Sequence, residues 1–219
     1  ANSINTEIAA NTAKVTNATH TGDVTGATAL TIATDAVDIA MLSATGTASA
    51  TTFLRGDNAW AAAGGLTEAD CWRLTTDFDG DADPIASNLE RADTDGFGLL
   101  GTGMTESSGI FSFPSTGYWL VRFHVSAYLS SGDNRHTECG IDVTENDSSY
   151  DEGVYFATFI QNTGGGTRSS QVGEVIIDVT SISNIKVRFV VANDNSATTI
   201  VGNTGKNYTY MVFLKLADT

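Results

Sequence analysis

The chain has 219 residues, 17% of them charged, and a formal net charge of −15 at pH 7. This acidity argues against binding to nucleic acid or to an anionic lipid surface, because both need clustered Lys and Arg. No apolar stretch is long enough to span a membrane, so membrane insertion is not expected.

Residues 1–17 predict a short helix. Ile4, Ile8 and Val15 lie on one side of such a helix, and Asn11 takes the position between them where an apolar contact would be expected. A helix of this length is marginal in water and needs partners. In one interpretation, three copies of the helix associate and Asn11 fixes their register. In the other, the helix docks on the rest of the chain and Asn11 faces water.

Residues 18–65 are rich in Thr, Ala and Gly, with few aromatics. Single apolar residues recur along them, namely Val24, Leu30, Ile32, Val37, Ile39, Met41, Leu42, Phe53 and Leu54. So few apolar residues cannot build a core within one chain. We therefore expect this segment to bury them against copies of itself from other chains, as an interleaved β shaft.

Two features of residues 4–62 resemble known fibrous proteins. "IAANT", which contains Asn11, resembles the Ile-x-x-Asn-Thr motif of trimeric coiled coils in bacterial trimeric adhesins and phage tail fibres. That resemblance implies that Ile4, Ile8 and Val15 face the trimer axis and that three Asn11 side chains hold a chloride or a similar anion there. "HTGDVTG", "LTIATDAV" and "TTFLRGDNAWA" are similar to the shafts of bacteriophage tail fibres, which precede a C-terminal receptor-binding head.

Residues 66–219 read as a succession of strands. "GYWLVRFHVSAYLS", residues 117–130, alternates apolar residues with more polar ones at a period of two, which is typical of a strand over a core. "CGIDV", "GVYFATFIQ", "QVGEVIIDV", "IKVRFVVAN" and "NYTYMVFLKL" continue the pattern, separated by turns rich in Gly, Asn, Asp and Ser. Many strands at short spacing without helices between them predict an antiparallel sandwich or barrel.

The same region resembles the tumour necrosis factor and complement globular-head superfamily. The resemblance rests on "GIFSFPSTGYWLVRFHV", with Gly109, Phe111, Pro114, Gly117 and Tyr118. It departs from the superfamily's pattern by one residue between Pro114 and Gly117. The resemblance implies a ten-stranded jelly-roll head that assembles as a homotrimer.

In the last predicted strand of this head, Tyr208 and Tyr210 share a face. That face is either the threefold packing surface or ordinary sandwich core.

Candidate binding residues come from the loops. Asp77, Asp79, Asp81 and Asp83 alternate in "DFDGDADP" and could supply oxygen ligands to calcium, although an EF-hand would need Glu where Asn88 stands. The other interpretation is a solvated acidic loop. Loops on a rigid sandwich are the expected place for receptor contacts. The candidates there are Asp133, Asn134, Arg135, His136, Tyr150, Tyr155 and Arg168, with the two tyrosines offering aromatic faces to a sugar.

The sequence offers no motif for catalysis. It has no Gly-x-Ser-x-Gly, and neither Cys71 nor Cys139 has a His at a diagnostic spacing, so we do not expect an enzyme or a required cofactor. Whether the two cysteines form a disulfide or stay free thiols is open.

Together, these patterns favour a homotrimeric phage tail fibre tip on the virion that attaches to a host cell-surface glycan or protein. The alternatives are an assembly module that only holds the trimer together, and a cellular adhesin or lectin of the same fold.

Overall fold

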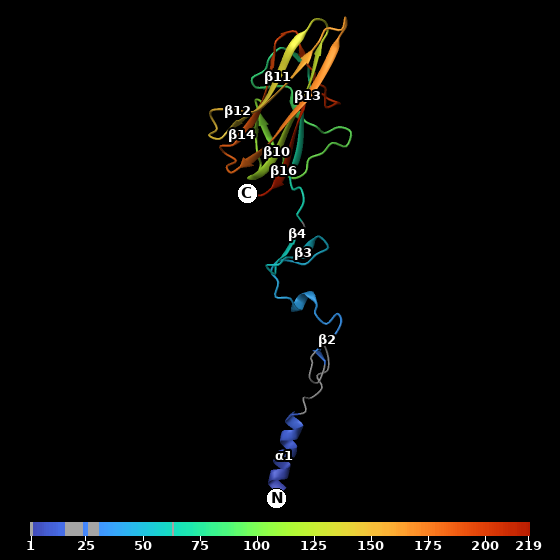
Figure 1. Cartoon of the computed structure of the whole chain (residues 1–219), viewed down its shortest axis with the longest axis vertical. Helices are drawn as coiled ribbons and strands as arrows, with labels where there is room; N and C mark the ends of the chain where they lie inside the picture. Colours follow the sequence, from blue (N-terminus) through green and yellow to red (C-terminus); the bar gives the residue numbers. More distant parts are fainter. Residues whose placement is uncertain (1, 16–23, 26–30, 63) are drawn as a thin grey trace. The chain divides into compact units, whose positions relative to one another are not determined.

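The computed structural model describes residues 2–15, 24–25, 31–62 and 64–219. The chain divides into two compact units, Ala1–Gly65 and Leu66–Thr219, which we call the N-terminal unit and the head (Figure 1). Within the described residues, no helix is long and apolar enough to cross a membrane.

The N-terminal unit consists of small, separate elements. Its helix α1 (Asn2–Val15) confirms the predicted helix. Two short antiparallel pairs follow, β1 (Val24–Thr25) with β2 (Thr31–Ile32), and β3 (Thr52–Leu54) with β4 (Trp60–Ala62), and the 3₁₀ helix η1 (Ile39–Met41) lies between them.

Wherever the structure describes a side chain of the N-terminal unit, that side chain is at least partly exposed, and none is buried. Ile32, Val37, Ile39, Met41 and Phe53 are among the exposed apolar residues. The part of the unit that the structure describes therefore forms no core within one chain, as its composition predicts.

The predicted trimeric coiled coil is not shown by this structure, because a single chain supplies one short helix. Ile4 and Ile8 lie on the exposed surface of α1. The side chains of Asn11 and Val15 lie outside the described residues, and so does the predicted anion layer.

The head is a sandwich of two antiparallel sheets. The first has the order β6-β15-β10-β16-β5-β7, with β13 paired to the other side of β10. Its strands are β5 (Ala69–Leu74), β6 (Phe78–Asp79), β7 (Leu89–Arg91), β10 (Gly117–Leu129), β13 (Thr167–Val179), β15 (Thr199–Ile200) and β16 (Tyr210–Ala217). The second has the order β12-β11-β14-β9-β8. Its strands are β8 (Thr105–Ser107), β9 (Ile110–Ser112), β11 (Asn134–Thr144), β12 (Asp151–Ile160) and β14 (Lys186–Asn193). The predicted mainly β, antiparallel head is confirmed.

The core lies between the two sheets and follows the predicted alternation. Every odd-numbered residue of β10 from Trp119 to Leu129 is buried. Phe111, Phe189 and Phe213 meet them from β9, β14 and β16, with 5.2–6.0 Å between their ring centroids. Full burial of such a side chain contributes roughly 1.5–3 kcal/mol to stability. The rigid sandwich that results fixes the positions of the outward-facing residues.

The strand register shows which strand ends and loops lie at each end of the head. Ala69 at the start of β5 pairs with Leu214, and Tyr118 at the start of β10 pairs with Ala217, so the chain enters the head beside its last strand. At the opposite end, Leu129 pairs with Thr167 and Asn134 pairs with Ile160. The loops at 130–133 and 161–166 therefore lie far from the point of entry (Figure 1).

Candidate functional site

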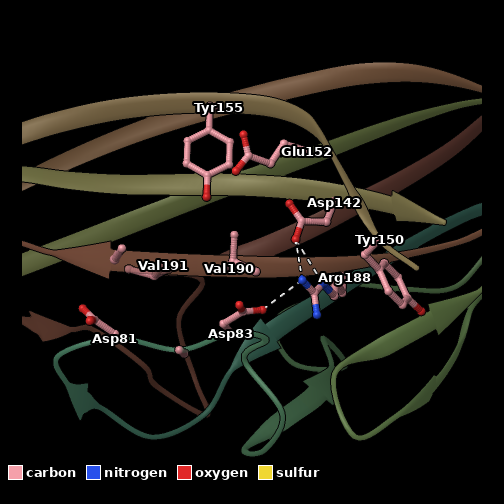
Figure 2. A pocket seen from close by; sticks show the side chains of 11 residues that line it. Asp81, Asp83, Asp142, Tyr150, Glu152, Tyr155, Arg188, Val190 and Val191 are labelled. Atoms are coloured by element: carbon pink, nitrogen blue, oxygen red, sulfur yellow. Dashed lines mark hydrogen bonds and ion pairs between the residues drawn. The ribbon is translucent and has the colours of Figure 1, made fainter. Parts of the chain in front are cut away.

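A cleft of about 290 Å³ opens on the outward face of the five-stranded sheet. We call it the Arg188 cleft. Strand β11 supplies Asp142, β12 supplies Glu152 and Tyr155, and β14 supplies Arg188, while Tyr150 precedes β12. Residues 81–83 cross over the other side of the cleft (Figure 2). Segments far apart in sequence thus meet there.

Arg188 is held from three sides. Its Nε donates to Oδ2 of Asp142 at 3.0 Å, and one of its terminal nitrogens lies 2.9 Å from the same oxygen and 3.0 Å from Oδ1 of Asp83. The guanidinium also lies over the ring of Tyr150, 4.7 Å from its centroid. Such charge-assisted and cation–π contacts fix the planar group in place.

Asp142 is 4% exposed, yet only one of its two carboxylate oxygens is bonded. Oδ1 is buried and has no hydrogen-bond partner. Burial raises the pKa of this carboxyl, and the hydrogen bond and charge of Arg188 oppose the rise. A buried acceptor without a donor costs roughly 1–3 kcal/mol, so the cleft contains an oxygen that a ligand donor would stabilise.

The ring of Tyr155 lies beside this oxygen because the residue opposite it on β11, Gly140, has no side chain. Tyr155 pairs with Gly140 across β11 and β12. A Cβ at Gly140 would lie 2.9 Å from Cε2 of Tyr155, 2.7 Å from Val190 and 3.3 Å from Oδ1 of Asp142. The glycine therefore gives the ring room to lie over the sheet. Tyr155 remains 47% exposed, which leaves part of its ring free for a ligand.

The cleft is acidic. Four carboxylates, those of Asp81, Asp83, Asp142 and Glu152, line it beside the single cation of Arg188. The acidic surroundings affect Tyr155. Burial raises the pKa of its hydroxyl, and the negative charges of nearby acids raise it further, namely Glu152, Asp142, Glu138 and Asp83.

The alternating aspartates predicted as a calcium loop do not converge. Asp77 accepts from the backbone N–H of Gly202, Asp79 from the hydroxyl of Thr199, and Asp81 from the backbone N–H of Asn193, while Asp83 pairs with Arg188. In the described part of the chain, no group of three or more His, Cys, Asp or Glu side chains could hold a metal ion. The geometry gives the calcium prediction no support and favours a loop pinned to the sandwich.

The predicted receptor residues separate into different regions. Asp133, Asn134 and Arg135 line a second hollow of about 440 Å³, with Phe159 and Ile160. Asn134 is fully buried and bonds to Thr137, Asn193 and the backbone of Asn195, so its role is structural.

Asp133 accepts a hydrogen bond from the backbone N–H of Asn162 and so connects the loops at 130–133 and 161–166, which we call the end loops. Arg135 forms an exposed two-bond pair with Asp194, which lowers the pKa of that carboxyl. His136, partly exposed, follows it in β11. Only part of the predicted loop surface is therefore available for contact.

Arg168 lies on the other sheet. Its guanidinium is over the rings of Tyr128 and Tyr208, at 5.1 and 5.6 Å from their centroids. Its position corrects the prediction that it belongs to an end loop, since it is already part of β13 and pairs with Tyr128.

The outward face of β10, β13 and β16 carries five apolar residues, and we call it the apolar face. These residues are Leu120, Val172, Ile176, Val212 and Leu214, and the row between Ile176 and Val172 also holds the ion pair of Arg122 with Glu174. Ile176 is 60% and Val172 53% exposed. Tyr210 lies on this side too and stacks on His124, whereas its neighbour Met211 points into the core. This placement decides against the interpretation of Tyr210 as sandwich core.

Cys71 and Cys139 are both free thiols. Burial raises the pKa of Cys71 to about 11 and that of Cys139 to about 12. The thiol of Cys139 accepts from the side-chain amide of Gln171 at 2.9 Å. The alternative of a disulfide is therefore excluded, and neither thiol resembles a reactive nucleophile.

Sequence reasoning missed Asp142, Arg188 and Gly140. Each is an outward residue of a strand whose pattern marks it only as facing away from the core. No spacing along the chain connects them, so only the pairing of β11 with β12 and β14 could have brought them together.

Comparison of the sequence with protein-family models finds no match, and comparison with curated proteins finds none either. Comparison of the fold finds similar solved structures. Eiger TNF from S. frugiperda is similar over 69% of this chain and 93% of its own, at 16% identity and a TM-score of 0.50. Murine APRIL is similar over 68% of this chain and 98% of its own, at 9% identity and a TM-score of 0.46. The likeness to Eiger TNF shows that the head has a TNF-like antiparallel jelly-roll fold.

Proposed function

We propose that this chain is the tip of a bacteriophage tail fibre, a homotrimer whose three heads attach to a glycan or protein on the host cell surface. The observation that carries this proposal is the exposure of apolar residues in both units of a single chain. Apolar residues such as Ile39 and Met41 in the N-terminal unit, and Ile176 on the apolar face, are all more than half exposed. Several exposed apolar residues gathered on one surface are typical of an interface.

In the described part of the N-terminal unit, no side chain is buried, so the exposed apolar residues join no core within that part. Two further copies, wound together with the first, would cover them. The resemblance of residues 4–62 to tail fibre shafts supports this arrangement, and so does the α1 helix at the place of the predicted coiled coil. There Asn11 would face its two copies and hold an anion.

In the head, the apolar face is the outward surface of three neighbouring strands. We propose that two further copies of the head pack against it. Val172, Ile176 and Leu120 would lose water contact, and each fully buried side chain of this size contributes about 1.5–3 kcal/mol. Tyr210 and Tyr208 would pack at the same interface. The TNF-like fold supports a threefold arrangement by resemblance.

The head surface outside the trimer interface would make the contacts with the receptor. Three heads on one stalk convert weak single contacts into avidity, because the second and third contacts form at high effective concentration. The end loops around Asp133 and Arg135 and the Arg188 cleft with Tyr150 and Tyr155 are the surfaces left available. None of them presents a nucleophile with an adjacent base, so binding without catalysis is proposed.

The first test is the mass of the full chain in solution by light scattering. One chain is 22.9 kDa, and the proposal expects a particle of about three times that mass, unchanged by a calcium chelator. A monomer would overturn it.

The second test separates attachment from mere assembly. The fluorescently labelled trimer is offered to a panel of bacteria, with periodate-treated and protease-treated cells as controls. Saturable binding that periodate abolishes supports a glycan receptor, and binding that protease abolishes supports a protein receptor. A stable trimer that binds no cell in the panel favours the assembly module instead.

A further inference from the structure

We propose that the Arg188 cleft binds an organic ammonium group, carried by an amino sugar or by a lysine side chain on the receptor. The inference rests on the proposed attachment function and names the chemistry that the head would recognise. It begins from Asp142, whose Oδ1 is buried and has no donor although the cleft opens beside it. Figure 2 shows this carboxylate between Arg188 and the ring of Tyr155.

The polar groups of the cleft favour a ligand that donates hydrogen bonds over one that accepts them. Arg188, its only cation, is already engaged by Asp142, Asp83 and the ring of Tyr150. The remaining polar atoms are mostly carboxylate oxygens, including Oδ1 of Asp142 and the exposed carboxylate of Glu152. An ammonium group supplies three donors in a compact volume, so it can donate to more than one of these acceptors at once.

Charge favours a cation over a neutral hydroxyl. With four carboxylates and one guanidinium lining the cleft, a positive ligand group reduces the repulsion among the acids. The partly exposed ring of Tyr155 adds an attractive face for a cation next to the same oxygen.

A metal ion fits less well than an ammonium group. The guanidinium of Arg188 lies between Asp83 and Asp142, and the described residues contain no set of three ligands that could hold an ion. The cleft also has an aromatic wall, which metal sites do not need. Its volume of about 290 Å³ is at the small end of ligand pockets and suits one sugar ring or one lysine side chain.

The test is isothermal titration of the full chain with three defined probes. They are a β-linked tetramer of glucosamine, the same tetramer fully N-acetylated, and a lysine tetrapeptide with blocked ends. We expect the glucosamine tetramer or the lysine peptide to bind, and the acetylated tetramer to bind at least tenfold more weakly than the probe that binds, because acetylation converts its amines to uncharged amides. Measurable binding of both tetramers with equal affinity, or no heat with any of the three probes at millimolar concentration, would overturn the proposal.

Variants locate the site. Asp142→Asn keeps the shape of the side chain and removes its charge, and we expect at least a tenfold loss of affinity for the ammonium probe. Glu152→Gln, on an exposed residue, should reduce affinity several-fold without affecting folding, and it keeps the test open if the Asp142 variant folds poorly. Glu145→Gln, which removes an exposed carboxylate outside the cleft, is the matched control. Unchanged affinity in both cleft variants would contradict the assignment.

The outcomes also separate the inference from the proposed function. Binding of the glucosamine tetramer alone identifies an amino sugar, and binding of the lysine peptide alone identifies a protein side chain; either result supports the ammonium site. A trimer that attaches to cells but ignores all three probes would overturn the ammonium site and leave attachment standing. Probe binding by a chain that attaches to no cell would support the site and count against attachment.

Discussion

The imidazole of His124 stacks on the ring of Tyr210, with 4.8 Å between the ring centroids and 20° between the ring planes. Nδ1 of the same imidazole lies 2.8 Å from the backbone oxygen of Tyr208. The pair joins β10 to β16 on the outward side of the sheet, beside the apolar face. An ordered aromatic pair on an outward sheet surface is well suited to pack against another protein surface.

A charge on the apolar face should separate the proposed trimer. Ile176→Asp places a carboxylate where each copy would bury an isoleucine, and an unpaired buried charge is strongly unfavourable. We expect the mass by light scattering to fall from three chains towards one at micromolar concentration. Ile182→Asp changes a similarly exposed isoleucine in the turn between β13 and β14 and should leave the mass unchanged. Retention of the trimer by the Ile176 variant would place the interface elsewhere.

The close approach of β12 to β13 depends on Gly173. A Cβ at this position would overlap the ring of Phe156, which packs edge-on against Phe123 in the core. Gly173→Ala should therefore lower the free energy of unfolding by about 1–3 kcal/mol, as expected for overpacking. Gly165→Ala is the control, because a Cβ there meets nothing within 4 Å. Urea denaturation of both variants checks the prediction, and equal midpoints would contradict it.

Both thiols should resist alkylation in the native protein. With pKa values raised by burial to about 11 for Cys71 and about 12 for Cys139, very little thiolate exists at pH 8. We expect iodoacetamide to label neither cysteine within an hour at pH 8, and to label both in 6 M guanidinium chloride, as read by intact mass. Rapid native labelling of Cys139 would show that the sandwich opens far more often than its packing implies.

Asp142 should make the head less stable as the pH rises. Because its pKa in the folded chain is raised above the ordinary value of about 3.9, the folded state binds more protons than the unfolded state between these two values. Stability from this group is therefore greatest below the ordinary pKa and falls as the pH rises through the folded one.

The Asp142→Asn variant isolates this effect. The difference in unfolding free energy between the unaltered chain and the variant should decrease as the pH rises from about 4 through the folded-state pKa of Asp142, and then level off. A difference that increases over this range would mean that the pair with Arg188 outweighs burial and lowers the pKa.

The sandwich could be predicted from sequence where local pattern decides structure. In β10, the alternation from Trp119 to Leu129 predicts both the strand and its buried side, because successive side chains of a strand point to opposite faces. The helix at Ile4 and Ile8 is predicted for the same local reason, with a period of 3.6 residues.

The Arg188 cleft could not be predicted, because it depends on register between distant strands. Arg188 reaches Asp142 through the pairing of those two residues across β14 and β11, which are separated by many residues in the chain. The sequence predicts a sugar contact for Tyr155 and a calcium ligand in Asp83. The fold brings both residues into one cleft. Arg168 shows the converse, since its position in the sequence assigns it to a loop, whereas its pairing with Tyr128 makes it the second residue of β13.

The place where the chain enters the head also determines how the head would bear mechanical load. Strand β5 is hydrogen-bonded to β16 from Ala69 to Arg73 and to β7 from Trp72 to Leu74. Ladder hydrogen bonds run across the strands, so tension applied at Leu66 along β5 shears all of these bonds at once and does not unzip them singly. Forced unfolding is governed by the unfolding barrier. A head held at its surface and pulled through Leu66 would therefore resist detachment of its first strand until the whole ladder gave way together.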